Sequence, residues 1–301
     1  MHALAQIDWW PVTAAVGVVA QPAVEPVGSP GPAPDPPAVV GLRGPVDHPF
    51  AWASVTKPVT ALAVLVAVEE GTLDLDQPAG PVGSTIRHLL AHASGLGPDL
   101  GSGGVDQLCP LTEPGRRRIY SNAGYEVLAD VLARASGLSF ASYLMAGVLE
   151  PLGMARTTLR ADEGRGLPSG AAAGLVGPLV DLLAVAAELL RPTLISPETL
   201  KMATSVAFPG LAGVVPGFGR FDPCDWGLGV ELRDGKQPHW MATTGSPATF
   251  GHFGQSGSFV WVDPVAGVAS AGLSDRAFGP WAAEVWPPLA DAVLAELDDA
   301  G

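Results

Sequence analysis

The chain has little positive charge. Only 16 of its 301 residues are Lys or Arg, against 30 Asp or Glu, so the formal net charge is −14. Binding to nucleic acid or to an anionic membrane surface depends on clustered cations, and we expect neither kind of partner. Charged residues make up only 15% of the chain and hydrophobic residues 48%, which excludes a disordered chain and allows a sizeable core. The length suits one large domain or two small ones.

Targeting signals and long apolar runs are also missing. The first Lys or Arg is Arg43, so no basic segment precedes an apolar one as it would in a secretory signal. The apolar stretches 12–20 and 59–68 are too short to span a bilayer. We therefore expect a cytoplasmic protein without a membrane span.

Cysteine is scarce. Cys109 and Cys224 are the only two and lie far apart in the sequence, so we expect free thiols in a reducing compartment. There is no Cys-x-x-Cys motif and no Cys/His cluster. His88 and His92 have a spacing seen in metal pairs, but the H-E-x-x-H register is absent, so we interpret both as structural. We expect neither a metal nor another cofactor.

Strand patterns occur near both ends of the chain, and helical patterns lie between them. Strands are predicted at 13–20, 38–42, 226–233, 239–244, 258–263 and 268–273. Helices are predicted at 58–70, 85–90, 123–135, 139–149, 178–190, 197–204 and 288–297. A proline-rich loop is expected at 22–37. This order predicts an α/β fold built from residues 1–75 and 205–301, with a helical subdomain inserted at 76–204.

The most informative segment places Ser54 three residues before Lys57, at the start of an apolar stretch. On a helix, positions i and i+3 share a face, so the hydroxyl and the amine are neighbours. An amine with a lowered pKa can take the proton of a hydroxyl and so activate it as a nucleophile. Such pairs also occur by chance, and the alternative is a helix-capping serine beside a solvent-facing lysine.

Two later segments supply groups that such a nucleophile needs. Tyr120 and Asn122 precede a predicted helix, where a phenol can transfer a proton and an amide can bind substrate. The alternative is a buried tyrosine with an asparagine helix cap. Further on, His252, Gly254 and Gln255 lie in a glycine-rich segment before a predicted strand. An amide there can join that of Ser54 as an oxyanion hole; the alternative is a hairpin with an exposed histidine.

Together these segments resemble the S-x-x-K, Y-x-N and K/H-x-G motifs of serine β-lactamases and penicillin-binding proteins, in the same order. Within that superfamily the chain most resembles the class C β-lactamase-like serine hydrolases, which include family VIII esterases and D-amino-acid peptidases. The segments 86–96, 150–154, 226–229 and 261–264 also match family patterns. The resemblance covers residues 50–297. It implies an antiparallel sheet flanked by helices, with the inserted helical subdomain.

The resemblance also implies an acyl-enzyme mechanism. Ser54 attacks a carbonyl, Lys57 and Tyr120 share the base and acid work, and Asn122 orients the substrate. The amides of Ser54 and Gln255 hold the oxyanion, while His252 and Gly254 take the positions of the third motif.

The chain departs from the family pattern at four places: His252, the bulky Phe253, the opening helix, and the proline-rich segment 22–37, which is unlike the family's regular early strands. His252 stands where most β-lactamases have a lysine that binds the substrate carboxylate, and a mostly neutral histidine is a weaker anchor. The helix that usually opens the fold is expected to be absent or truncated. The basic run at 116–118 is interpreted as a solvated face, with attraction of an anionic substrate as the alternative.

Three functions remain open. The first is a serine hydrolase acting on a small-molecule ester or amide, most readily a carboxylesterase. The second is a β-lactamase or D-Ala-type peptidase. The third is a non-catalytic binding domain that retains the fold. Neither the physiological substrate nor the oligomeric state follows from the sequence.

Overall fold

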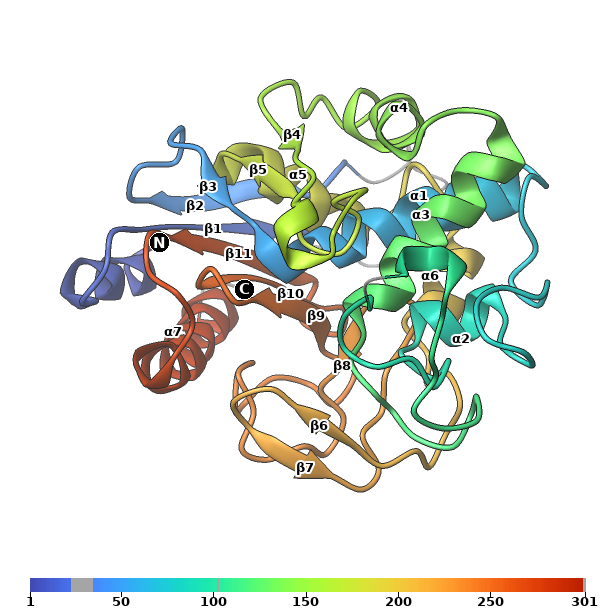
Figure 1. Ribbon diagram of the computed structural model, residues 1–301. Coiled ribbons are helices and arrows are strands. Elements are labelled where there is room, and N and C mark those ends of the chain that lie inside the picture. Colours follow the sequence, from blue (N-terminus) through green and yellow to red (C-terminus); the bar gives the residue numbers. More distant parts are fainter. Residues whose placement is uncertain (23–34, 102, 300–301) are drawn as a thin grey trace, which may run out of the picture.

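The computed structural model describes residues 1–22, 35–101 and 103–299, and an antiparallel sheet of six strands forms its centre (Figure 1). The strand order is β2-β1-β11-β10-β9-β8. The strands are β1 (Ala14–Ala20), β2 (Ala38–Arg43), β8 (Glu231–Leu232), β9 (Phe250–Gly254), β10 (Ser258–Asp263) and β11 (Val268–Ser274). Both ends of the chain therefore meet in one sheet, which confirms the predicted α/β fold. Most of the loop expected at 22–37 lies outside the described residues.

Helices cover both faces of this sheet. In β10, Val260 and Val262 join the core on the side of α1 (Thr56–Glu69) and α5 (Leu179–Leu190). The alternate residues Phe259 and Trp261 join the core on the side of α7 (Pro280–Asp298). Every residue of β10 is buried for this reason. Although α5 lies within 76–204, it packs on β1, β10 and β11, and we describe it with the sheet.

The remaining helices lie beside the sheet, toward the right of Figure 1. They are α2 (Ile86–Leu90), α3 (Asn122–Ser136), α4 (Phe140–Leu144) with the π-helix Met145–Leu149, and α6 (Pro197–Ala203). The structure also has two smaller sheets. The first has three strands, β3 (Phe50–Ala51), β5 (Leu175–Gly177) and β4 (Thr158–Leu159), in that order. The second is the hairpin of β6 (Gly213–Val215) and β7 (Gly219–Phe221).

Among the described residues, no single helix has both the length and the apolarity to cross a membrane. One pair of helices, Asn122–Ser136 and Phe140–Leu149, meets both criteria jointly but is bent by 83°.

The strand predicted at 239–244 is wrong. Instead of pairing with a strand, the side chains of His239 and Trp240 bind the buried carboxylate of Glu231, at 3.0 and 2.8 Å. The strand predicted at 226–233 shortens to β8, because the chain turns sharply before it. At Gly229 the backbone has φ +91°, and an added Cβ would lie 2.2 Å from the Cβ of Ala61 in α1.

Several smaller expectations are also corrected or confirmed. The opening helix is reduced to a 3-10 helix, Ala3–Trp9, whose Trp9 is 89% exposed and not a core residue. The last helix begins at Pro280 rather than residue 288 and contains Pro287 and Pro288. Both cysteines are free thiols, Cys109 exposed and Cys224 buried.

Candidate active site

The structure places Ser54 and Lys57 next to each other, as the i, i+3 spacing predicts. Ser54 lies in a 3-10 turn, Ala53–Val55, that leads directly into α1, and Lys57 lies in the first turn of α1. Lys57 Nζ is 3.3 Å from Ser54 Oγ, and the lysine side chain is completely buried. The alternative of a solvent-facing lysine is therefore wrong.

The turn that presents Ser54 is held from both sides. Trp52 is buried, its indole donates to the Gly177 carbonyl at 3.1 Å, and its own carbonyl accepts from Ser258 Oγ at 2.7 Å. Ala53 has φ +45°, a conformation that costs a non-glycine residue roughly 1–3 kcal/mol and needs such support. The strain falls on the residue directly before the candidate nucleophile.

Lys57 has two further partners that can only accept hydrogen bonds. Its Nζ lies 2.7 Å from Asn122 Oδ1 and 2.9 Å from the Ala172 carbonyl oxygen. A neutral amine has two hydrogens and one lone pair. If the hydrogens go to these two acceptors, the lone pair is left for the proton of Ser54.

Burial favours this neutral form. Desolvation lowers the pKa of Lys57 to about 7, although the carboxylates of Glu126 and Asp99 partly oppose the shift. The neutral amine is therefore accessible near neutral pH. An amine in this state beside a hydroxyl is suited to act as a general base.

Tyr120 lies on the other side of the serine. Burial raises the pKa of its phenol well above the usual range, and a hydrogen bond with Ser54 partly offsets the rise. The phenol is therefore protonated at neutral pH and can donate a proton but cannot act as a phenolate base. Lys57 Nζ sits 4.7 Å from the centre of the Tyr120 ring, which completes a cluster of three side chains.

His252 is buried in the sheet, so the alternative of an exposed hairpin histidine is wrong. It belongs to strand β9, which the sequence did not predict. Burial lowers the pKa of His252 to about 3, so the ring is neutral. Because Nδ1 lies 2.7 Å from the Phe253 carbonyl, which can only accept, the hydrogen is on Nδ1. Nε2 then accepts from the Tyr120 hydroxyl at 3.4 Å and orients it.

Gly254 and Gln255 follow His252 and face the nucleophile. An added Cβ at Gly254 would lie 2.3 Å from Ser258 Oγ and 3.1 Å from the amide nitrogen of Ser54, so only glycine allows β9 to approach the turn. In the described part of the chain, the amides of Ser54 and Gln255 donate no backbone hydrogen bond. Both are available as the donors of an oxyanion hole.

Asn122 is not the helix cap that one interpretation assigned to it. Ser121 caps α3 by accepting from the Gly124 amide at 3.0 Å, and Asn122 is the first helical residue. Its amide group instead joins Lys57 to Asp99, with Nδ2 donating to Asp99 Oδ1 at 2.9 Å. Since carboxylate oxygens only accept, this bond fixes the orientation of the amide and aims Oδ1 at Lys57.

Three further residues support the site, and the sequence did not point to two of them, Asp99 and Glu126. Asp99 orients Asn122, as described. Glu126 is buried and accepts from the Ser169 amide at 2.7 Å and the Ala172 amide at 3.3 Å, which positions the Ala172 carbonyl that binds Lys57. His92 is structural, as expected: its Nδ1 accepts from the Ser121 amide at 3.1 Å and holds the backbone beside Tyr120.

We expect Asp99 to tune Lys57 through its charge. In Asp99→Asn the hydrogen bond to Asn122 can persist but the charge is gone, so the pKa of Lys57 falls and the acidic limb of the activity profile moves to lower pH. In Asp99→Ala the hydrogen bond is lost too, and kcat/KM should fall by about 3- to 10-fold. Rate–pH profiles of both variants test this, with Asp130→Asn, a half-buried carboxylate that pairs with Arg134 on α3, as a control. Identical profiles in all three would contradict the assignment.

These side chains surround a pocket of about 210 Å³, lined by Ala53, Ser54, Tyr120, Asn122, Arg165, Ala173, Pro216, Trp226, His252, Phe253 and Gln255. All seven residues singled out in the three sequence motifs therefore lie in or beside one cavity. Among the described residues, no group of three or more His, Cys, Asp or Glu side chains is arranged to hold a metal ion.

The fold and this cluster of side chains define the class of protein, a serine hydrolase of the β-lactamase-like superfamily. The Beta-lactamase family model matches residues 35–295, and the chain belongs to that family. A solved β-lactamase from Mycobacterium bovis is 48% identical, with a TM-score of 0.87 over 98% of this chain and 99% of that one.

Curated relatives match over shorter stretches. A penicillin-binding protein from Bacillus subtilis is 34% identical over 36% of this chain and 30% of its own length. Esterase EstB from Burkholderia gladioli is 38% identical over 36% of this chain and 38% of its own length. The matched region thus spans about a third of the length of each relative.

Proposed function

We propose that the protein is a serine hydrolase that forms an acyl-enzyme on Ser54 and acts on a small carboxylic ester or amide. One observation supports this above all: the completely buried amine of Lys57, with a pKa of about 7, lies 3.3 Å from Ser54 Oγ. A lysine in a purely structural role has no need of this combination of burial, lowered pKa and a neighbouring hydroxyl.

In the proposed acylation step, the neutral Lys57 takes the proton of Ser54. The Ser54 oxygen forms a bond to the substrate carbonyl carbon, and the negative charge on the carbonyl oxygen is held by the amides of Ser54 and Gln255. The tetrahedral intermediate then collapses. The bond from carbon to the leaving oxygen of an ester, or to the leaving nitrogen of an amide, breaks, and the alcohol or amine leaves with a proton from Tyr120.

Tyr120 regains its proton from the ammonium group of Lys57, so the acyl-enzyme forms with Lys57 neutral again. A water molecule then enters the same site, gives its proton to Lys57 and attacks the acyl carbon. The bond from carbon to the Ser54 oxygen breaks, and Ser54 leaves with the proton that the Lys57 ammonium returns. His252, neutral and hydrogen-bonded to the Tyr120 hydroxyl at 3.4 Å, keeps the phenol in place during both steps.

We expect Tyr120→Phe to lower kcat by about 10²-fold, because the leaving group then departs without a positioned acid. The loss should shrink for esters of acidic phenols, which need little protonation, and stay large for alkyl esters. Comparing kcat for both ester types in the variant checks this. Tyr143→Phe, at a tyrosine that donates to Glu70 outside the site, is the control.

A neutral substrate is favoured by the charges around Ser54. His252 is uncharged where related enzymes use a lysine to bind a carboxylate. Asp99, which raises the pKa of Lys57 through its charge, adds a negative charge on the Asn122 side of the pocket. Arg165 also lines the pocket, but its side chain is exposed and lies 4.0 Å from the carboxylate of Asp162. An anionic group next to the reacting carbonyl therefore has a weak anchor.

A β-lactamase is the second candidate. It is favoured by the 48% identity to the Mycobacterium bovis protein described as one, and by Arg165 at the edge of the pocket. A D-Ala-type peptidase and a non-catalytic binding domain are the remaining alternatives.

Hydrolysis of a p-nitrophenyl short-chain ester and of a chromogenic cephalosporin by the same protein preparation ranks the two candidates. We expect the higher kcat/KM for the ester. Faster turnover of the cephalosporin would overturn the esterase proposal in favour of a β-lactamase. Turnover of neither, by folded protein that also fails to react with a fluorophosphonate at Ser54, would favour a binding domain.

A further inference from the structure

A second and larger pocket lies directly beside the catalytic one. It has a volume of about 510 Å³, against about 210 Å³ for the catalytic pocket, and both pockets are lined by Tyr120 and Pro216. A cavity of this size can hold a drug-sized molecule. The two pockets therefore offer adjacent sites on either side of Tyr120 and Pro216.

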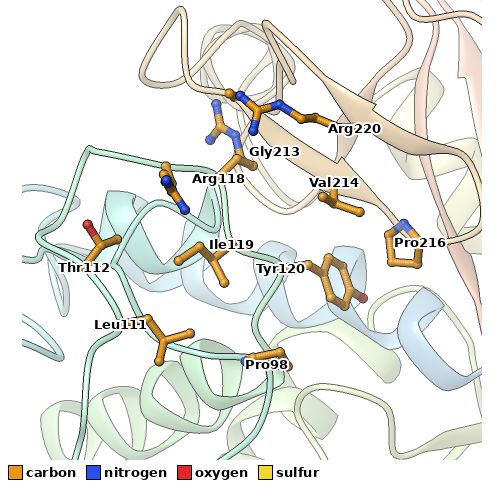
Figure 2. A pocket seen from close by; sticks show the side chains of 12 residues that line it. Pro98, Leu111, Thr112, Arg118, Ile119, Tyr120, Gly213, Val214, Pro216 and Arg220 are labelled. Carbon is orange, nitrogen blue, oxygen red and sulfur yellow. The ribbon is translucent and has the colours of Figure 1, made fainter.

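The walls of the second pocket are largely apolar. Figure 2 shows Leu111, Ile119 and Val214 arranged around it, from the segment that leads to Tyr120 and from strand β6. Leu111 is 69% exposed and Val214 is 58% exposed, so large apolar side chains face solvent at this place. Apolar side chains that gather around a concavity mark a site for an apolar ligand group.

Three arginines also line this pocket, and two of them are exposed. Arg117 and Arg220 are both exposed lining residues, one from the segment before Tyr120 and the other from strand β7. Arg220 forms an exposed ion pair with Asp222 at 3.5 Å. Arg117 has no salt bridge within the described chain. In a chain with a net charge of −14, two outward-facing arginines at one apolar pocket favour an anionic group there.

Arg118, between them in sequence, has a different role. It is buried and donates to the carbonyls of Cys224, at 3.0 Å, Ala207, at 2.8 Å, Phe208, at 3.3 Å, and Ala91. It thus fastens the segment before Tyr120 to the chain around β6 and β7. The expectation of a solvated basic run is wrong for this residue, whereas Arg117 and Arg220 remain exposed at the pocket.

The position of Tyr120 determines which part of a substrate reaches this pocket. Its hydroxyl is hydrogen-bonded to His252 on the catalytic side, and its side chain borders the second pocket. In the proposed reaction, Tyr120 gives its proton to the leaving oxygen. A group attached to that oxygen therefore extends past Tyr120, while the acyl group remains on the side of Asn122 and Ala173.

We propose that the second pocket binds the leaving alcohol of the substrate, and that this alcohol is an extended apolar chain with an anionic group at its far end. The apolar walls hold the chain, and Arg117 and Arg220 hold the anion. The inference rests on the proposed hydrolase function, since it assigns the leaving-group side of the same reaction. This anion does not conflict with the preference for a neutral group at the scissile bond, because Arg117 and Arg220 line the second pocket and not the catalytic one.

Matched acetate esters test the inference. Acetate release is measured for methyl acetate, octyl acetate and 8-acetoxyoctanoate, and octanoate release for methyl octanoate. We expect kcat/KM to rise by at least about tenfold from methyl to octyl acetate, since each buried CH₂ is worth ~0.8 kcal/mol, and to rise again for 8-acetoxyoctanoate. Equal values for the three acetates, or a gain confined to methyl octanoate, would overturn the inference.

Variants locate the effect. Arg117→Gln and Arg220→Gln should reduce the preference for 8-acetoxyoctanoate over octyl acetate, and the neighbouring Arg116→Gln, outside the pocket and paired with Glu113, should not. Val214→Trp should reduce the preference for octyl over methyl acetate by filling the pocket. Val265→Trp, at a 75% exposed valine in a turn away from the pocket, is its control. Preferences unchanged in all the pocket variants would contradict the assignment.

A binding measurement separates this inference from the proposed function. The product alcohol 8-hydroxyoctanoate is titrated into Ser54→Ala protein by calorimetry, which requires no catalysis. Saturable binding that weakens in Arg117→Gln supports the pocket even if no ester is hydrolysed. Absence of binding, together with hydrolysis of methyl acetate by the unchanged protein, would overturn the pocket and leave the hydrolase function standing.

Discussion

Replacing Ser54 with alanine is expected to abolish ester hydrolysis, with kcat falling by up to about 10⁶-fold, as for the loss of a nucleophile in other acyl-transfer enzymes. The reason is that the described pocket offers no second hydroxyl next to Lys57 Nζ that can replace it: the Tyr120 phenol is held by His252. The measurement is steady-state hydrolysis of a p-nitrophenyl short-chain ester.

Ser205→Ala is the matched control, because the hydroxyl of this exposed serine donates to the Lys201 carbonyl and the residue lies outside the pocket. Its activity should equal that of the unchanged protein. Circular dichroism and thermal unfolding should show that Ser54→Ala remains folded. Activity within tenfold of the unchanged protein in folded Ser54→Ala would show that another group carries the reaction.

The second large effect is expected for Lys57→Met. The side chain keeps its apolar volume but loses the amine, so Ser54 has no base and kcat/KM should fall by about 10²–10⁴-fold. Lys201→Met removes an exposed lysine from α6 and should have no effect. If Lys57→Met hydrolysed the ester as fast as Lys201→Met, Lys57 would not be the base.

The pH dependence gives an independent test of Lys57. The reactive form is the neutral amine, so kcat/KM should fall as the pH drops through about 7, the pKa of Lys57, and be level above it. His252, with a pKa of about 3, does not titrate in this range, and the phenol of Tyr120 stays protonated. In Lys57→Met the acidic limb near pH 7 should disappear from the residual activity.

The local part of the site could be predicted from the sequence. The i, i+3 spacing of Ser54 and Lys57 was sufficient because helix geometry alone brings such residues together. The helix itself, α1, was predicted from an apolar stretch that is buried on nearly all sides. The capping serine and first-turn proline likewise identified α6 correctly.

The part that depends on distant contacts could not be predicted. Ala172 binds Lys57 directly, Asp99 acts through Asn122, and Glu126 acts through the Ala172 backbone. They come from three separate segments, and no local pattern marks any of them. Strand β9 was missed because its glycines at 251 and 254 weaken the strand signal, although the second of them is there to let the strand approach Ser54. The predicted strand at 239–244 failed for the opposite reason, since its side chains bind a buried carboxylate.

The basic run at 116–118 illustrates the same limit. Sequence alone treats its three arginines alike, whereas the structure gives them separate environments. Arg116 pairs with Glu113 at the surface. Arg117 lines the second pocket, beside the catalytic one, and Arg118 is buried among carbonyl groups. Only tertiary packing distinguishes them.

The most direct test of the account is covalent labelling of the nucleophile. Folded protein is treated with a fluorophosphonate and its intact mass and peptide map are recorded, with Ser54→Ala treated in parallel. We expect a single adduct on Ser54, none in the variant, and faster labelling above pH 7 than below it. An unlabelled folded protein, or an adduct on a different residue, would contradict the claim that Ser54 is the acylated nucleophile.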